Sequence, residues 1–444
     1  MADDATLLRS LLRLRHLTQH AAFRAQFERT ARELAERAGD KRLAKVTVSE
    51  RQLRRWIAGN VTTAPLPDTC RVLEAMFGHP VQALLSTPEP PSPDRPTMAV
   101  AGNFGADMGR TLHMAAQRAR QFSATADETN IGRDALSSLR DEAARLAEAY
   151  PRQPLAVLLP DLATFQDDTL TLLEGRQPPE LTRDLYVLAS LASGMLAKAN
   201  HDLRSPREAM VHARLAYQCA SNAEHLALRA WVRGIESLIK YWAGQPRESR
   251  EYALSGLEVP GVSGTVRVWL YALQSRAEAV LGNAAAADAA VGLGEAARDR
   301  VQGDDLDSLG GICTFPVERG LYYAADAGVV LPVQLSGSPL AARAAGYADA
   351  AIRAYATTAE PSFGDQAGAH AALAIARIRG GDVDGAADAL TPVLSLPSAM
   401  RINGVVSCVT SVHRALSAAS GSSVAAETQH AIEAFCHAPA ALSA

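Results

Sequence analysis

A short arginine-rich segment, residues 49–59, carries the clearest functional pattern in the sequence. Ser49 is a favoured N-cap residue and Gln52 stands at the N3 position, so we expect a helix to begin here. Leu53 and Trp56 share one face of that helix. Its other faces carry the polar residues Glu50, Arg51, Arg54 and Arg55. A helix that two apolar anchors hold in place, with its arginines exposed, suits the reading of bases and phosphates in the major groove of DNA.

A second helix is predicted immediately before this segment. Thr30 at the N-cap and Glu33 at N3 form a capping-box pattern, and Gly39 is a typical residue at a helix end. Residues 40–47 separate this helix from the next one. They include three basic residues that we expect to meet DNA phosphates, namely Lys41, Arg42 and Lys45.

The two segments, together with the stretch from Pro65 to Gly78, resemble the Cro/repressor-type helix-turn-helix of bacterial regulators of the xenobiotic-response-element family. The match follows the family's order of a scaffold helix, a recognition helix, a Trp-x-x-Gly exit, a proline-containing loop and a final helix ending in glycine. It covers about residues 8 to 86. Residues 40–47 replace the tight turn of the family, which leaves the geometry between the two helices open.

The resemblance implies double-stranded DNA as a partner and binding as a homodimer to paired half-sites. It makes Glu50, Arg51 and Arg55 base-facing, Arg54 a contact to the DNA backbone or to the flank of the site, and Leu53 and Trp56 core residues. The predicted DNA-binding residues are Ser49, Glu50, Arg51, Gln52, Arg54, Arg55, Lys41, Arg42 and Lys45.

Charge and proline content divide the chain into a basic head and an acidic body. Residues 1–86 hold fourteen Lys and Arg against nine Asp and Glu, a formal charge of +5, whereas the whole chain carries −4. The remainder is therefore −9, and such asymmetry favours the head as the part that binds a polyanion. A proline-rich stretch, residues 87–97, is the predicted linker, because proline fixes φ and removes an amide donor.

The body, residues 98–444, is predicted to be all-α. Apolar residues recur at spacings of three and four, as in the run from Leu181 to Met195 and the run from Leu228 to Trp242. Turn signals at Pro206, Pro246 and Ala284 recur after 40 and 38 residues, near the period of helix-pair repeats. The pattern resembles a tetratricopeptide-like solenoid, and joined to the head it resembles the actinobacterial regulators built in this way.

Two regions of the body are candidates for binding. Five aromatic residues cluster in the middle repeats and pack the solenoid or line a groove for a small molecule or peptide; they are Trp231, Tyr241, Trp242, Trp269 and Tyr271. Residues 301–339 are interrupted by Gly, Asp and Pro and are expected to form loops around one short helix, which either cap the solenoid or line its concave face.

Other chemistry finds little support in the sequence. The five cysteines are scattered with no C-x-x-C pair, and neither H-E-x-x-H nor G-x-S-x-G occurs, so we expect no metal, no cofactor and no enzymatic activity. An enzyme would need an acid and base cluster that only the fold assembles, in a polar pocket near residues 301–339. No apolar run is long enough for a membrane span and the N-terminus lacks the pattern of a secretory signal, so we expect a cytoplasmic protein.

The sequence thus predicts a transcriptional regulator with a helix-turn-helix head and a helical-repeat body that dimerises and senses an effector. The alternative is a protein-interaction scaffold with a vestigial head.

Overall fold

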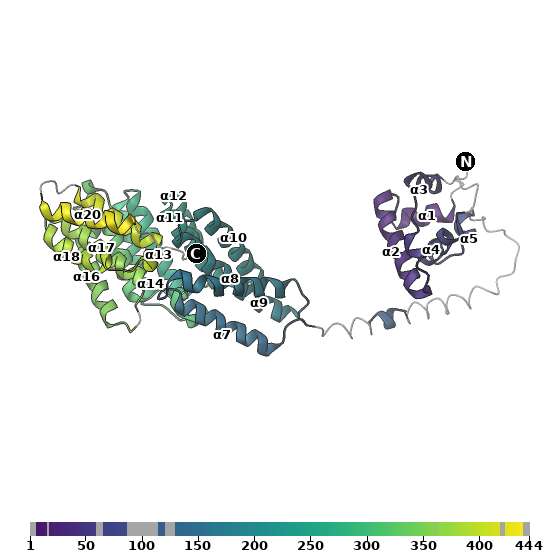
Figure 1. Ribbon diagram of the computed structural model, residues 1–444, viewed down its shortest axis with the longest axis horizontal. Coiled ribbons are helices and arrows are strands. Elements are labelled where there is room, and N and C mark those ends of the chain that lie inside the picture. Colours follow the sequence, from purple (N-terminus) through teal and green to yellow (C-terminus); the bar gives the residue numbers. More distant parts are fainter. Residues whose placement is uncertain are drawn as a thin grey trace. The chain divides into compact units, whose positions relative to one another are not determined.

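The computed structural model describes residues 6–15, 17–58, 65–86, 114–119, 129–359, 361–417 and 422–437. Every regular element in these ranges is helical, which confirms the predicted all-α class (Figure 1). Contacts divide the chain into two compact units, residues 1–115 and 116–444, and each is described by itself. The predicted linker, residues 87–97, and the predicted helix end at Gly59 lie outside the described residues.

The N-terminal unit is a small cluster of helices around one core. Phe23, Phe27 and Ala31 recur every four residues along one helix and are fully buried in that core. The helices are α1 (Leu7–Leu14), α2 (His20–Ala38), α3 (Glu50–Ile57), α4 (Pro67–Phe77) and α5 (Val81–Leu85).

The helix before the arginine-rich segment is longer than the capping-box pattern predicts. Thr30 lies in the middle of α2, where its hydroxyl donates to the carbonyl oxygen of Gln26 at 3.0 Å, so its assignment as an N-cap is wrong. The apolar period of the buried Phe23, Phe27 and Ala31 continues the helix through this position, and packing outweighs the local capping signal. The predicted end is confirmed, because Gly39 is the C-cap with a φ of +66°.

The segment between α2 and α3 is folded rather than extended. Its 3₁₀ turn η1 (Leu43–Lys45) buries Leu43 in the core, and Val48 is buried shortly afterwards. The ring of His20 hydrogen-bonds through Nε2 to the carbonyl oxygen of Val48 at 3.0 Å, which joins the segment to the start of α2. Two core side chains therefore hold this turn and leave its basic residues outside.

The C-terminal unit is built from helix hairpins that follow one another along the chain (Figure 1). From α9 onward, each odd-numbered helix packs against the even-numbered helix that follows and against the next odd-numbered helix. Each hairpin thus buries its apolar face against its neighbours. The helices are α7 (Arg133–Ala149), α8 (Leu155–Leu173), α9 (Pro179–Asp202), α10 (Pro206–Asn222), α11 (Leu226–Trp242), α12 (Pro246–Leu257), α13 (Thr265–Val280), α14 (Ala284–Arg298), α15 (Val317–Val330), α16 (Pro339–Thr357), α17 (Phe363–Arg379), α18 (Val383–Leu394), α19 (Asn403–Leu416) and α20 (Ser423–His437).

Residues 301–339 contain more helix than the sequence predicts. The 3₁₀ turns η2 (Asp307–Leu309) and η3 (Gly311–Cys313) precede α15, a full helix of 14 residues. The expectation of one short helix was wrong because glycines inside α15 were read as breaks. Gly328 instead allows close packing, since a Cβ atom there would lie 2.7 Å from the Cβ of Ala344 in α16.

Two glycines let the tryptophans of the body approach the neighbouring hairpin. The indole of Trp231 on α11 covers Gly194 on α9, where a Cβ atom would lie 2.2 Å from its Cζ3. The indole of Trp269 on α13 covers Gly234 on α11 in the same way, with a corresponding distance of 2.4 Å. The same glycine-and-indole contact therefore occurs between two successive pairs of odd-numbered helices.

A methyl group at the first of these glycines tests the contact. We expect Gly194→Ala to lower the free energy of unfolding by about 1–3 kcal/mol, because the indole of Trp231 has to move from its packed position. Gly346→Ala in α16 is the matched control, since a Cβ atom there has open space around it. It should raise stability by about 0.5–1 kcal/mol. Urea unfolding followed by circular dichroism measures both, and equal effects of the two variants would contradict the packing argument.

Candidate functional site

The face of α3 that looks away from the core carries the predicted DNA-binding residues. Ser49 caps the helix, its Oγ accepting from the amide of Gln52 at 3.3 Å, as predicted. Leu53 and Trp56 are buried, and the indole of Trp56 meets the ring of Phe23 edge-on with centroids 6.1 Å apart. These anchors fix the helix so that its polar residues stay outside.

The basic residues of this region are exposed. On α3, Glu50 and Arg54 form an ion pair across one turn, with 56% and 77% of their side chains exposed. Such an exposed pair contributes little to stability, so a phosphate or a base can replace the carboxylate as the partner of Arg54. The exposed residues of the α3 face and of the preceding turn are Glu50, Arg51, Arg54, Arg55, Lys41, Arg42 and Lys45.

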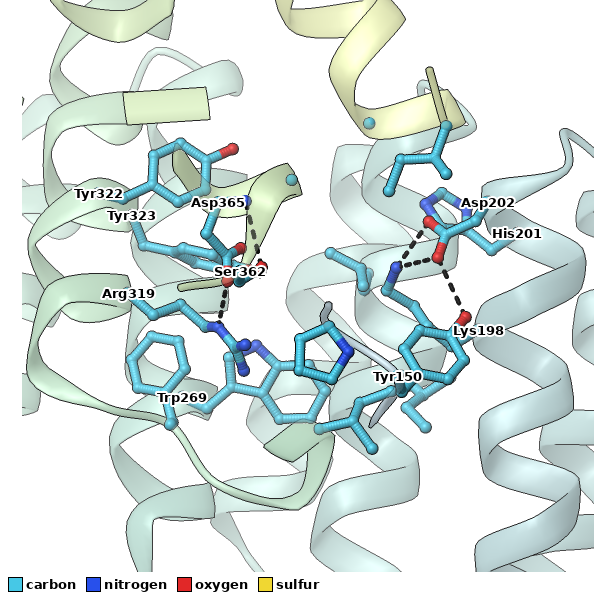
Figure 2. Close-up of a pocket in the computed structure, with 18 of the residues that line it drawn as sticks. Tyr150, Lys198, His201, Asp202, Trp269, Arg319, Tyr322, Tyr323, Ser362 and Asp365 are labelled. Carbon is cyan, nitrogen blue, oxygen red and sulfur yellow. Dashed lines mark hydrogen bonds and ion pairs between the residues drawn. The ribbon is translucent and has the colours of Figure 1, made fainter. Parts of the chain in front are cut away.

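A cavity of about 120 Å³ lies inside the C-terminal unit (Figure 2). Its walls come from α9, α11, α13, α15, α17 and α19, from the segment 150–155 and from the segment 312–315, so residues 301–339 help to line it. Polar groups converge on it from two sides, and Figure 2 shows them facing each other across the gap.

One polar group lies at the end of α9. The ammonium group of Lys198 donates to both carboxylate oxygens of Asp202, at 2.6 and 2.5 Å, and the hydroxyl of Tyr150 donates to the same carboxylate at 3.0 Å. His201 beside them is 3% exposed, and its imidazole ring forms no hydrogen bond with any described residue. Burial lowers the pKa of His201 to about 4, with Lys198 and Arg276 acting in the same direction, so the imidazole is neutral at pH 7.

The opposite polar group joins α15 to α17. Arg319 donates from Nε to the carboxylate of Asp365 at 2.7 Å and from Nη1 to the carbonyl oxygen of Thr314 at 3.0 Å. Ser362 caps α17, its Oγ accepting from the amide of Asp365. Burial by itself disfavours the charged guanidinium, yet the ion pair with Asp365 keeps the pKa of Arg319 above its usual value.

A third cation, Arg276, lies against the aromatic rings of Tyr241 and Tyr323. Arg276 is 1% exposed and donates from Nε to Asp326 at 2.6 Å, and Tyr241 donates to the same carboxylate at 3.1 Å. The guanidinium carbon lies 4.2 Å from the ring centroid of Tyr241 and 4.4 Å from that of Tyr323. Although burial opposes the charge, Asp326 keeps the pKa of Arg276 well above its usual value. Its Nη2 is buried without a hydrogen-bond partner among the described residues.

The structure separates the five aromatic residues that the sequence grouped together. Trp231, Trp242 and Trp269 line the cavity. Tyr241 lies behind it, against Arg276, and Tyr271 lies on α13 outside the lining. The indole nitrogen of Trp231 donates to the carbonyl oxygen of Ile312 at 3.3 Å, which ties the loop 312–315 to α11.

This is the polar, convergent pocket near residues 301–339 on which the enzyme alternative depends, and its groups are better arranged for binding than for catalysis. Burial raises the pKa of the Cys313 thiol and raises that of Cys408 to about 12, so neither is a thiolate at pH 7. Both lining carboxylates are engaged in ion pairs, and His201 is a weak base. Within the described ranges no cluster of three potential metal ligands occurs. Lack of enzymatic activity stays a prediction.

The charged residues in and beside this cavity are absent from the site residues that the sequence predicted. A detectable signal existed for two of them, because Asp326 is a lone acid in an apolar run and Lys198 is one of only four lysines in the chain. His201 and Asp202 are the last two residues of α9, shortly before the predicted turn signal at Pro206. The partners of Arg319 and Arg276 lie 46 and 50 positions away, a separation that no local pattern reveals.

Comparison of the chain with protein-family models, with curated proteins and with solved structures found no match in any of the three. Among the described residues, no helix combines the length and the apolar character that crossing a membrane requires.

The buried pair beside the cavity can be tested by removing one charge. We expect Asp326→Asn to lower the free energy of unfolding by about 3–5 kcal/mol, because Arg276 would keep a buried charge without compensation. Asp288→Asn, which breaks the more exposed pair with Arg343, is the control and should cost less than about 1 kcal/mol. Denaturant unfolding of both variants measures the difference, and similar losses would show that burial of the Arg276 pair has no special weight.

Acid should destabilise the body through His201. Its folded-state pKa of about 4 lies below the ordinary value of 6.5, so the unfolded chain binds more protons between these values. The contribution of His201 to the free energy of unfolding is complete above pH 6.5 and is lost as the pH falls toward 4. From pH 7.5 to 5.0 the cost is about 2 kcal/mol, which His201→Gln should remove. Unfolding at the two pH values measures it, with His430→Gln as the exposed control; an unchanged acid loss in His201→Gln would contradict the neutral, buried imidazole.

Proposed function

We propose that the protein is a DNA-binding transcription regulator whose N-terminal unit is a helix-turn-helix of the Cro/repressor type. The observation that carries the proposal is the arrangement of α3, a capped helix that Leu53 and Trp56 anchor in the core and whose arginines face solvent. A helix held in this way can enter the major groove without changing its own packing.

The charges of the head support the same conclusion. Arg51, Arg54 and Arg55 on α3 and the three cations on the turn before it outnumber the acids among these residues, Asp40 and Glu50. Arginine donates in pairs to guanine O6 and N7, whereas the turn's lysines suit phosphate. We assign base contacts to Arg51, Arg55 and Glu50 and phosphate contacts to Lys41, Arg42, Lys45 and Arg54.

We infer that the body dimerises the protein and senses an effector. A single weakly basic head binds too little of a site, so the tetratricopeptide-like body joins two chains into a homodimer that occupies paired half-sites in the cytoplasm. An effector that prefers one curvature of the stacked hairpins then changes the spacing of the two heads and with it the affinity for the operator. The cavity supplies a place for such an effector.

Binding of genomic DNA fragments at 50 and 200 mM salt tests the proposal. We expect preference for particular fragments over bulk DNA, and a loss of affinity of about 10³-fold or more across this salt range. Arg51→Ala and Arg55→Ala should each cost about 1–3 kcal/mol on the preferred fragment and relax preference at particular base pairs. Lys45→Ala should weaken all fragments alike and lower the salt slope by about two, because each of the two heads loses one phosphate contact.

The control removes one cation from the body. Arg353 is exposed on α16, and Arg353→Ala changes the net charge equally without touching the head. If Arg51→Ala, Arg55→Ala and Arg353→Ala all bind DNA like the unaltered chain, the assignment of base-reading residues is wrong. If the unaltered chain shows neither preference nor salt dependence, the head does not bind DNA and the interaction-scaffold alternative is favoured.

A further inference from the structure

The cavity of the C-terminal unit contains charges that are already balanced. Each of its three cations has its own carboxylate: Lys198 bonds Asp202, Arg319 bonds Asp365, and Arg276 bonds Asp326. His201 adds no charge at neutral pH. A ligand with a net charge would enter without a counterion or would break one of these pairs, and both outcomes are costly in a buried site. The lining therefore favours a neutral ligand.

The polar groups that remain for a ligand are mainly donors. The Nε and Nη1 atoms of Arg319 already donate hydrogen bonds to Asp365 and to the carbonyl oxygen of Thr314, whereas its Nη2 forms no hydrogen bond with a described residue. Lys198 gives two of its three protons to Asp202, and the ring of His201 has no hydrogen-bond partner within the described ranges. A ligand satisfies these groups with acceptor oxygens such as a carbonyl, an ether or a hydroxyl.

The apolar part of the lining suits a ring. Trp231, Trp269 and Phe315 are part of the lining, and Figure 2 shows Trp269 beside Arg319. The volume of about 120 Å³ is somewhat below the roughly 150 Å³ of a dry cavity that holds benzene. The lining also includes the exposed Gln153, where a substituent can leave the cavity. A single small ring fits this space better than a peptide segment.

We propose that this cavity binds a small, uncharged ring compound that carries an acceptor oxygen, held against the aromatic lining and hydrogen-bonded by Arg319 or by the Lys198 and His201 side. The inference that this compound is the effector of the regulator rests on the proposed function. The inference that the cavity is a binding site does not depend on that function.

A charge series on one ring tests the inference with the full-length protein at pH 7.5. Benzamide is the neutral probe with an acceptor oxygen; benzoate, benzylammonium and toluene are the matched anion, cation and apolar ring. Isothermal titration calorimetry should show benzamide binding, with each of the other three at least about tenfold weaker. Equal or tighter binding of benzoate or benzylammonium would overturn the neutral-ligand inference. Equal binding of toluene would overturn the role of the donors, and no binding by any probe would overturn the site.

A variant series assigns the binding to this cavity. Arg319→Lys keeps the charge opposite Asp365 but removes the free Nη2 donor, so we expect benzamide to bind at least about fivefold more weakly. Arg379→Lys is the matched control, because Arg379 donates to the carbonyl oxygen of Leu331 away from the cavity lining. Trp269→Leu should weaken benzamide and toluene alike, and circular dichroism checks that each variant is folded. Equal effects of Arg319→Lys and Arg379→Lys would contradict the assignment, as would unchanged binding in both Arg319→Lys and Trp269→Leu.

The link to regulation needs a separate readout. We expect benzamide at saturation to change the affinity for a preferred DNA fragment, and the change should be absent in any cavity variant that no longer binds it. Calorimetric binding without any change in DNA affinity would refute the effector role and leave the site intact. Failure of the unaltered chain to bind DNA would refute the proposed function, whatever the calorimetry shows.

Discussion

The ion pair between Arg276 and Asp326 is the interaction on which the centre of the body depends. It joins α13 to α15, and the rings stacked on the guanidinium come from α11 and α15, so one cation connects three successive odd-numbered helices. A guanidinium that is 1% exposed is tolerated only because a carboxylate and several aromatic faces replace its water. The separation of these helices, and with it the width of the cavity, is tied to that arrangement.

Tryptophans and glycines of the odd-numbered helices also shape the cavity. Trp231 and Trp269 each lie over a glycine of the preceding odd-numbered helix, at Gly194 and Gly234. The missing side chains let the indoles approach the backbone of the preceding odd-numbered helix, and both indoles line the cavity. Packing of the hairpins and shaping of the cavity are therefore two results of the same contacts.

The two candidate sites use charge in opposite ways. On α3 the arginines are exposed, and the pair of Arg54 with Glu50 is an exposed one, so exchanging its carboxylate for a phosphate costs little. In the cavity every cation is bound to a carboxylate, and exchange would leave a buried charge uncompensated. The head therefore suits a polyanion and the cavity a neutral molecule.

The sequence alone determined what depends on near neighbours. Ser49 and Gln52 predicted the start of α3, Leu53 and Trp56 predicted its buried face, and the spacing of three and four predicted the buried faces of α9 and α11. These features follow from capping and helical periodicity, which act within a few residues. Local signals failed where packing outweighed them, at Thr30 inside α2 and at the glycines of α15.

Only the tertiary structure decided which charges meet. Arg276 and Asp326 lie 50 positions apart, Arg319 and Asp365 lie 46 apart, and Tyr150 reaches Asp202 across 52. No local pattern links the partners in any of these pairs, and stacking of the hairpins brings them together. A buried charge acquires its partner, its protonation and its place at a cavity from neighbours that are distant in the chain, so the sequence revealed the exposed surface of α3 but not the ion pairs of the cavity.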